Sequence, residues 1–228
     1  MGILYITATP IGNLEDVSKR ALRALTEVDL ILCEDTRVTK KLLDHYQIKT
    51  PTLSYHQHSK IQKIERIVNF LKEGKNLALV SDAGTPGISD PGNLLIKDAT
   101  NRLGNEVKVV PIPGSSAITS AASISAFPMD KFLFLGFPPA KKKRKKFFEE
   151  IINSKYPVIF YESPYRVIKT LKELRIEAEV YNLKPKIVAC RELTKKFETI
   201  YRGTIEEVIK QIEKDIIKGE FVIIFGKG

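Results

Sequence analysis

Residues 81–92, with the sequence SDAGTPGISDPG, hold the residue types best suited to binding a small ligand. Glycines let a backbone adopt positive φ angles and approach a bound molecule closely, and prolines reduce the entropy lost when a loop is ordered. Asp82 and Asp90 add two carboxylates that accept hydrogen bonds. A stiff loop of this length is longer than a simple connector requires. We therefore expect a ligand-binding loop, with a well-packed connector as the alternative.

Three other polar segments, PIGNLED, EDTR and PIPGSSA, also follow apolar runs typical of strands. The last of them opens a helix rich in small residues at Ser115, where free backbone N–H groups can bind an anion or the polar edge of a ligand. Simple capping of that helix by Ser115 is the alternative. Ligands of open α/β sheets bind beyond the carboxyl ends of the strands. If the first sheet is parallel, all four loops meet at one edge and form one site.

Six consecutive cationic residues, KKKRKK at positions 141–146, mark the second half of the chain. That half is also the more basic one: residues 113–228 hold 22 basic and 14 acidic side chains, against 15 and 13 in residues 1–112. A basic surface suits a polyanion, and contacts with phosphates make such binding strongly salt-dependent. We expect a nucleic-acid partner. Lysines that serve only solubility or heat stability are the alternative.

Missing motifs exclude several common chemistries. The sequence has no GxxxxGK[ST] phosphate loop, no GxGxxG after its first strand, and no CxxC or clustered cysteine–histidine set. His56 and His58 have the spacing of one strand face, but no third ligand stands near them, so we expect a polar strand and no metal. Cys33 and Cys190 lie in separate apolar runs and are expected as buried free thiols of a cytoplasmic protein.

The elements that position these loops alternate regularly in the first half. Short β-branched and apolar runs predict strands at residues 3–9, 28–33, 52–55, 76–80 and 106–112. Apolar residues at helical spacing predict the helices between them, at residues 18–27, 36–46, 61–73 and 93–103. Continuously apolar strands that alternate with helices are typical of a parallel sheet covered on both faces.

The second half predicts a mixed sheet, because two of its strands follow each other without a helix. Strands are expected at residues 131–137, 157–161, 187–193, 198–203 and 221–225. Helices are expected at residues 115–125, 141–153, 165–174 and 206–217. The 228 residues thus predict an α/β protein with two domains, residues 1–112 and 113–228. No apolar run approaches the roughly 20 residues that a membrane-spanning helix needs, so we expect no membrane partner.

Seven segments, in this order, resemble the tetrapyrrole methylase superfamily: TPIGNLEDVSKRAL, EDTRVTKKLL, SDAGTPGISDPG, PGSSA, FLGFPPAKKKRKK, YESPYRV and CRELTKKFETIYRG. Within that superfamily they are most similar to the ribosomal RNA small subunit methyltransferase I group, and the resemblance covers nearly the whole chain. One departure is Tyr165, where that group has a histidine. The planar polar ring of tyrosine leaves the assignment unchanged.

The resemblance implies two α/β domains of the tetrapyrrole methylase type with a cleft between them, a homodimer, and S-adenosylmethionine as methyl donor. It implies methylation of the ribose 2′-hydroxyl of a decoding-centre cytidine in small-subunit (16S) ribosomal RNA, either as free RNA or in the assembled small subunit. Carried over by motif, the donor pocket uses Pro10, Asp82, Ala83, Gly84, Ile88, Ser115, Ser116, Ala117, Tyr161, Arg191 and Leu193.

A ribose hydroxyl is a weak nucleophile, so a general base helps the transfer. We expect Asp35 in that role, since the EDTR segment also offers Arg37 to hold a phosphate. A helix cap with a local ion pair is the alternative for Asp35 and Arg37. The other candidate bases are Glu34, Asp82, Glu162 and Lys141. RNA phosphates are expected at Arg37, Lys141, Arg144 and Arg166.

Two other functions are compatible with the sequence. A sister enzyme that methylates a tetrapyrrole carbon would share the donor pocket but would have less use for the cationic residues 141–146. A non-enzymatic RNA-binding protein of the same fold would keep those residues and lose donor binding. Binding of a porphyrin-like ligand would favour the tetrapyrrole methyltransferase. Absence of donor binding would favour the non-enzymatic RNA-binding protein.

Overall fold

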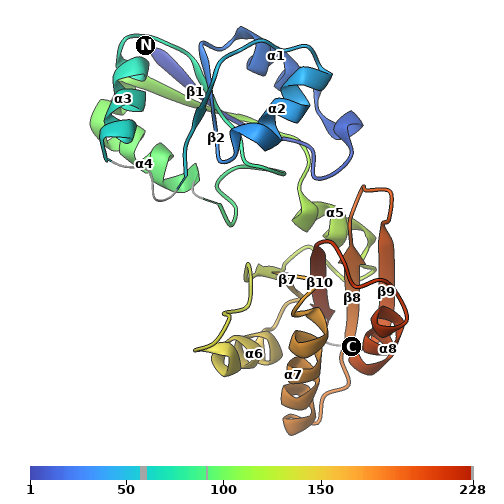
Figure 1. Cartoon of the computed structure of the whole chain (residues 1–228). Coiled ribbons are helices and arrows are strands. Elements are labelled where there is room, and N and C mark those ends of the chain that lie inside the picture. The colour runs from blue at the N-terminus through green and yellow to red at the C-terminus, as the bar shows by residue number, and fades with distance from the viewer. Residues whose placement is uncertain (57–60, 91, 227–228) are drawn as a thin grey trace. The chain divides into compact units, whose positions relative to one another are not determined.

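The computed structural model describes residues 1–56, 61–90 and 92–226 (Figure 1). The chain divides into two compact units, Met1–Ser116 and Ala117–Gly228. Each unit has a sheet and a core of its own. The boundary expected between residues 112 and 113 falls at the end of the last strand of the first unit, shortly before this division.

The first unit is built on a five-stranded sheet whose pairings are all parallel. Its strand order is β3-β2-β4-β1-β5. The strands are β1 (Gly2–Thr7), β2 (Leu30–Cys33), β3 (Thr52–Ser54), β4 (Leu77–Leu79) and β5 (Val107–Ile112). The parallel sheet predicted from the apolar strands is confirmed, and the carboxyl ends of all five strands lie at one edge.

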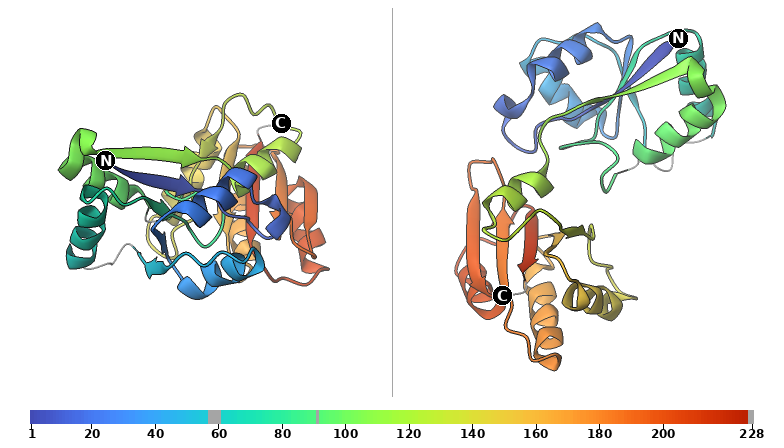
Figure 2. Two further views of the ribbon diagram at one scale, coloured as in Figure 1. Left: turned by 90° about the horizontal axis from the view of Figure 1, so that it is seen from above. Right: turned by 180° about the vertical axis from the view of Figure 1, so that it is seen from behind.

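Helices cover both faces of this sheet, as Figures 1 and 2 show. They are α1 (Lys19–Glu27), α2 (Thr36–His45), α3 (Ile61–Lys72) and α4 (Gly92–Leu103). Side chains of a strand alternate between its two faces. In the central strand β4, Leu77 and Leu79 therefore pack with α3 and α4, whereas Ala78 packs with α1 and α2. The chain leaves β4 toward the face opposite to the one used after β1 and β2. In open α/β sheets, ligands bind beyond the carboxyl ends of the strands where the connections change face in this way.

Local sequence signals explain where these helices begin and end. The Ser18 hydroxyl accepts a hydrogen bond from the amide of Ala21 at 3.0 Å and so caps α1, as the sequence predicts. The chain turns after α3 at Gly74, whose φ of +86° suits glycine.

The second unit holds a mixed five-stranded sheet in the order β6-β7-β10-β8-β9. Only the β6–β7 pair is parallel among the strand pairs of the described residues. The strands are β6 (Leu133–Phe134), β7 (Val158–Glu162), β8 (Lys186–Arg191), β9 (Thr199–Thr204) and β10 (Phe221–Gly226). The helices are α5 (Ala117–Ile124), α6 (Arg144–Asn153), α7 (Val167–Val180) and α8 (Ile205–Glu213). The mixed sheet predicted for this half is confirmed.

Four predicted boundaries in the second unit are wrong. The helix expected to end at residue 217 ends at Glu213. The strand expected at residues 131–137 is only two residues long, because a turn at Gly136 (φ +64°) and two prolines follow it. The helix expected from residue 141 begins at Arg144, since Lys143 adopts a left-handed conformation with φ of 68°. The helix expected to end at residue 174 continues to Val180, and buried Ala178 prolongs its apolar face.

Within the described ranges, no helix is long and apolar enough to cross a membrane. The predicted polar strand face that includes His58 lies outside the described residues.

Candidate functional site

In the first unit, the loop after β4 is hydrogen-bonded to the loop after β1. The amide of Thr9 donates to the carbonyl of Gly84 at 2.9 Å, and the amide of Gly84 donates to the carbonyl of Thr9 at 3.1 Å. The hydroxyl of Thr9 also donates to the carbonyl of Ser81 at 3.3 Å. These bonds extend the sheet by one bridge beyond its strands and hold the two loops side by side.

The loops after β2 and β5 join the same group. The backbone amide of Asp35 donates to Oδ1 of Asp82 at 3.1 Å, which ties the loop after β2 to the loop after β4. The hydroxyl of Thr85 donates to the carbonyl of Ser115 at 3.3 Å, and the Ser115 hydroxyl donates to the carbonyl of Asp16 at 3.2 Å. The predicted meeting of the four loops at one edge of the sheet is confirmed.

Glycines allow this close approach of backbones. Gly84 has a φ of +80°, and a Cβ there would lie 3.3 Å from Cγ2 of Ile11. A Cβ on Gly114 would lie 3.0 Å from Cβ of Ala8. Such contacts are tighter than side chains normally tolerate, so both positions favour glycine. The loop after β4 and the segment before α5 are therefore packed tightly against the loop after β1, with no room for a side chain at Gly84 or Gly114.

The two aspartates of the loop at residues 81–92 have different roles. Oδ1 of Asp90 accepts hydrogen bonds from the amides of Gly87 at 2.5 Å and Gly92 at 3.1 Å, so Asp90 fixes the shape of the loop. Asp82 is exposed, as is the neighbouring Ala83. An exposed carboxylate held by one backbone amide is suited to accept a hydrogen bond from a ligand.

The other donor-pocket residues predicted in the first unit belong to the same four loops. Pro10 and Gly84 are buried, Ser115 and Ser116 are half-buried, and Ile88 is exposed. One neighbouring residue was not expected from the sequence. The hydroxyl of Thr7, fully buried at the carboxyl end of β1, is without a hydrogen-bond partner. Thr7 lies in a β-branched run, so its sequence context predicts only a strand residue.

Glu34 and Asp35 follow β2 and differ in acidity. Burial raises the pKa of Glu34 above its ordinary value, and the negative charges of Asp82 and Asp90 raise it further. Hydrogen bonds from Arg37 lower the pKa of Asp35 to about 2. Arg37 reaches Oδ2 of Asp35 through Nη2 at 2.6 Å and Oδ1 through Nε at 3.0 Å.

Asp35 also caps α2, because its Oδ1 accepts a hydrogen bond from the backbone amide of Arg37 at 2.8 Å. The helix cap and local ion pair considered as the alternative for these residues are therefore present. The side chain of Arg37 nevertheless remains 88% exposed. The roles of Asp35 as base and of Arg37 as a phosphate ligand stay predictions.

In the second unit, Glu162 ends β7 inside a buried polar network. Its Oε1 pairs with Arg166 at 2.8 Å and accepts from the amide of Ser163 at 2.8 Å. Its Oε2 accepts from the hydroxyl of Thr170 at 2.6 Å. The side chain is fully buried and both of its oxygens accept hydrogen bonds, so Glu162 is a structural residue and is not accessible to a substrate as a base.

Arg144, predicted as a ligand of RNA phosphates, belongs to the same network. It donates to Oε2 of Glu173 at 2.8 Å and 2.5 Å, to the Thr170 hydroxyl at 2.9 Å and to the carbonyl of Pro139 at 2.8 Å. Its side chain is only 11% exposed. The guanidinium predicted to bind RNA is thus occupied by its own protein. Arg166, predicted for the same role, is largely occupied in the same way.

Four predicted donor-pocket residues lie in the second unit. Ala117 begins α5, and Leu193 is buried just after β8. Tyr161 is half-buried, and its ring packs against Phe134 at 5.0 Å between centroids. Arg191 is buried and donates to the carbonyl of Ile216 and to the Thr199 hydroxyl, and it pairs with Asp215 at 3.3 Å. The Arg191 side chain therefore ties the end of β8 to the start of β9 and to the segment before β10, and its role in the donor pocket stays a prediction.

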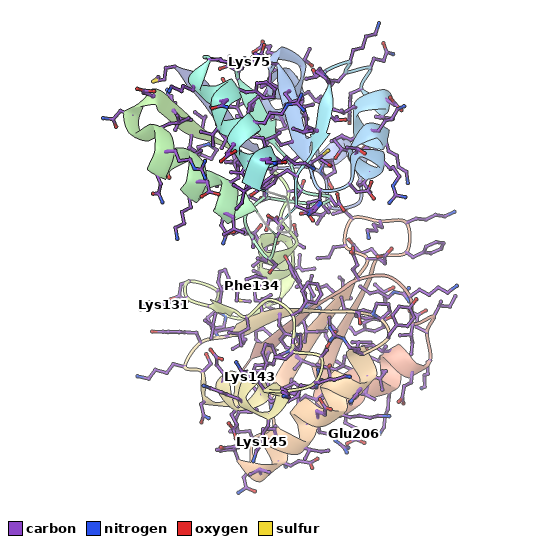
Figure 3. All side chains as sticks on the ribbon, turned by 60° about the vertical axis from the view of Figure 1, so that its left-hand side comes forward. Lys75, Lys131, Phe134, Lys143, Lys145 and Glu206 are labelled. Atoms are coloured by element: carbon purple, nitrogen blue, oxygen red, sulfur yellow. The ribbon has the colours of Figure 1, made fainter. Side chains whose placement is uncertain are left out.

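The cationic residues 141–146 divide between a loop and a helix. Lys141, Lys142 and Lys143 are exposed and precede α6, whereas Lys145 and Lys146 are exposed in its first turn. Figure 3 shows Lys143 and Lys145 in this region. The two aromatic residues that follow, Phe147 and Phe148, are buried in the core. No group of three or more histidine, cysteine or carboxylate side chains suited to a metal occurs among the described residues.

Comparison with known proteins identifies the family. The sequence profile of the Tetrapyrrole (Corrin/Porphyrin) Methylases matches residues 4–209. Proteins named ribosomal RNA small subunit methyltransferase I are similar over almost the whole chain. The one from Bacillus subtilis is 47% identical over 98% of this chain and 75% of its own length. The one from Thermotoga maritima is 44% identical over 98% of both chains.

Solved structures show the same fold at low sequence identity. The methyltransferase CobJ has a TM-score of 0.71 and 18% identity, covering 100% of this chain and 95% of its own. A uroporphyrin-III C-methyltransferase from Thermus thermophilus, complexed with S-adenosylhomocysteine, has a TM-score of 0.65 and 15% identity over 99% and 98% of the two chains. The chain therefore belongs to the tetrapyrrole methylase family, and within it to the ribosomal RNA small subunit methyltransferase I group.

Proposed function

We propose that this protein is an S-adenosylmethionine-dependent methyltransferase of small-subunit ribosomal RNA, and that its target is the ribose 2′-hydroxyl of a decoding-centre cytidine. The observation that carries the proposal is the 44–47% identity, over 98% of the chain, to proteins named ribosomal RNA small subunit methyltransferase I. A homodimer acting in the cytoplasm is part of the same proposal.

The four-loop edge of the first unit fits an S-adenosylmethionine donor. Its adenosine and methionyl amino groups need acceptors, which exposed Asp82 and the nearby loop carbonyls supply. Gly84 and Gly114 let the loops pack closely, and the buried hydroxyl of Thr7 is left without a hydrogen-bond partner at the carboxyl end of β1. Pro10, Ala83, Ile88, Ser115 and Ser116 complete this part of the pocket, and Ala117, Tyr161, Arg191 and Leu193 are its proposed contribution from the second unit.

When bound, the donor supplies an activated methyl group on a sulfonium, so the protein needs only to position the acceptor and remove its proton. Holding two reactants in line contributes roughly 7–11 kcal/mol to lowering a barrier. Asp35 is the proposed base, already ionised because its pKa is about 2. A carboxylate with so low a pKa is a weak base while it is paired with Arg37. If Arg37 pairs with an RNA phosphate, Asp35 loses this partner and its pKa rises, which makes it a stronger base.

Glu34 is the competing base, because burial and the charges of Asp82 and Asp90 raise its pKa toward the working range. The two candidates predict different pH profiles. The comparison uses kcat/KM, which reports the pKa values of the free enzyme. With Asp35 as base, kcat/KM stays constant as pH falls through the ordinary range of carboxylates, because Arg37 holds the pKa of Asp35 at about 2 before RNA binds. With Glu34 as base, the rate falls with acid at a pKa above 4.5.

RNA phosphates are proposed to contact Lys141, Lys142 and Lys143 on the loop before α6, together with Arg37 of the first unit. Lys142 and Lys143 take the place of Arg144 and Arg166 as proposed phosphate ligands, because the guanidinium groups of the two arginines bind protein carboxylates and carbonyls.

The test combines two measurements on the purified full chain. Calorimetric titration with S-adenosylmethionine measures donor binding, and incubation of labelled donor with small ribosomal subunits, followed by nucleoside analysis, locates the methyl group. Label in 2′-O-methylcytidine supports the proposal. Label in another nucleoside refutes the target, label in an added porphyrinogen supports the sister enzyme, and absence of donor binding refutes the enzyme altogether.

A further inference from the structure

Two aromatic side chains are exposed on neighbouring loops of the second unit. Tyr165, which follows β7, is 95% exposed, and Phe137, which follows β6, is 54% exposed. Exposed rings beside cationic side chains are how proteins hold unstacked nucleobases. We infer that Phe137 and Tyr165 form a base-stacking surface that selects a single-stranded segment of the RNA substrate. The inference rests on the proposed function and adds a role that phosphate contacts do not supply.

The structure joins the two loops directly. Nη1 of Arg166 donates to the carbonyl of Pro138 at 3.4 Å, so the residues that follow Tyr165 and Phe137 are hydrogen-bonded to each other. The amide of Tyr161 donates to the carbonyl of Gly136 at 2.8 Å and fixes the other side of the Phe137 loop. Both rings therefore leave the backbone at the same end of the β6–β7 pair.

Phe137 is supported on one side and open on the other. Its ring packs against Tyr161 at 5.3 Å between centroids, with the planes inclined by 55°. Pro138 and Pro139 restrict the backbone directly after it. A ring held in this way loses little conformational entropy when a base stacks on its exposed part.

The cations needed to hold the RNA backbone stand on the same loop. Lys141, Lys142 and Lys143 are exposed and follow Phe137 within a few residues. None of these three lysines forms an ion pair within the described part of the chain. Arg144 anchors the loop through the carbonyl of Pro139 at 2.8 Å. The loop between β6 and α6 thus carries an exposed aromatic ring and three exposed lysines that form no ion pair in the described part of the chain, and hydrogen bonds at Gly136 and Pro139 hold it in place.

The combination distinguishes single strands from duplexes. Lysines attract any phosphate backbone, whereas a protein ring stacks only on a base that is not already stacked within a helix. Loss of a ring should therefore lower affinity for single-stranded RNA without changing the salt dependence, because no charge is removed.

Because the chain has no tryptophan, Tyr165→Trp gives a single fluorescent reporter at the proposed surface. Tyr156→Trp is the matched control: Tyr156 is 45% exposed, precedes β7 instead of following it, and has Nζ of Lys131 at 5.8 Å from its ring centroid. Short single-stranded RNA should quench the Tyr165→Trp protein and leave the Tyr156→Trp protein unchanged. Duplex RNA of the same sequence should quench neither. Equal quenching by duplex, or none by single strands, overturns the inference.

Affinity gives a second measurement. Tyr165→Ala should weaken binding of single-stranded RNA about 5- to 150-fold, the usual range for one stacked base. Tyr165→Phe should retain binding, because it keeps the ring. Tyr156→Ala serves as control for both variants. Unchanged affinity of the Tyr165→Ala protein overturns the inference.

Methyl transfer by the wild-type protein separates this inference from the proposed function. If label from S-adenosylmethionine enters small-subunit RNA but the Tyr165→Trp fluorescence does not respond, the stacking surface is refuted and the function stands. If single-stranded RNA quenches Tyr165→Trp but no label is transferred, the function is refuted and the stacking surface stands.

Discussion

The backbone amide of Asp35 and the carboxylate of Asp82 are joined by a 3.1 Å hydrogen bond that links the loops after β2 and β4. A carboxylate held by a backbone donor keeps one orientation. Ligand binding then does not have to order this side chain, so less conformational entropy is lost on binding. Asp82 is exposed at the same time, so this bond prepares it as an acceptor for a ligand.

Replacing Asp82 with alanine is expected to lower the affinity for S-adenosylmethionine about 10- to 150-fold, the usual effect of losing one hydrogen bond to a charged group. RNA affinity should be largely retained, since Lys141, Lys142 and Lys143 belong to the second unit. Calorimetric titration measures the first and fluorescence anisotropy the second. Asp44→Ala, at an exposed position of α2, is the control. Retained donor affinity in the Asp82→Ala protein would show that this carboxylate is not a ligand.

Gly84→Ala is expected to reduce both stability and donor affinity. The positive φ of +80° costs an alanine roughly 1–2 kcal/mol, and contact of its Cβ with Ile11 adds to that. Gly104→Ala is the matched control, because its φ is also positive (+51°) but nothing lies within 4 Å of the added Cβ. Chemical denaturation and donor titration of both variants separate backbone strain from crowding at the site. Equal effects in the two variants would contradict the tight packing at Gly84.

Glu162→Gln removes the charge that Arg166 pairs with in the buried network. Breaking a buried ion pair costs about 3–5 kcal/mol, and we expect the low end because the Arg166 side chain is 31% exposed. Urea unfolding gives the change in free energy. Glu206→Gln, which removes an exposed pair with Lys210 at 2.7 Å, should have little effect. A Glu162→Gln protein as stable as this control would mean that the network does not stabilise the unit.

Neutralising Lys141, Lys142 and Lys143 with glutamine should make RNA binding less sensitive to salt. Each lost contact with a single strand reduces the slope of log K against log salt by about 0.7, so three contacts reduce it by about 2. Arg144→Gln should instead lower the free energy of unfolding and leave the slope unchanged, because its guanidinium binds Glu173 and Pro139. Binding isotherms over a salt series test both statements, and an unaltered slope in the triple variant would exclude these lysines from phosphate contact.

Alkaline pH should destabilise the second unit through two buried groups. Burial raises the pKa of Cys190 to about 12, and burial together with the hydrogen bond to Asp215 raises that of Tyr201 to about 12. Between pH 9 and 12 the unfolded chain releases the Cys190 proton while the folded chain keeps it, so stability falls as pH rises. Urea midpoints over this range should decline, and less so in Cys190→Ala. A thiol reagent should modify neither Cys33 nor Cys190 in the native protein below pH 9.

Much of the fold was predictable because apolar patterns are local signals. The strand β4 reads LAL in the sequence, and its burial on both faces by helices explains why no polar residue interrupts it. The meeting of the four loops was predictable for the same reason, since parallel strands end at one edge. The strand order, with β4 between β2 and β1, depends on contacts between distant segments and could not be read from local patterns.

The side chains of the cationic residues 141–146 were less predictable. Six like charges in a row carry no local information about which one folds inward. Arg144 does so because Thr170 and Glu173 lie on α7, far along the chain, and because Lys143 turns the backbone with a φ of 68°. For Asp35 the sequence left two interpretations open, a general base or a helix cap with a local ion pair, and the structure shows the ion pair with Arg37 at 2.6 Å.

The strand order of the first unit also governs how the nascent chain folds. In the finished sheet β1 pairs with β4 and β5. During synthesis β1 therefore emerges first and must wait for residues 77–79, and then for residues 107–112, before its pairings can form. Meanwhile β2 and β3, which pair with each other, can associate earlier. The unit consequently becomes compact only after almost its whole length has left the ribosome. Until then its apolar first strand is exposed, and chaperones bind exposed apolar segments of this kind.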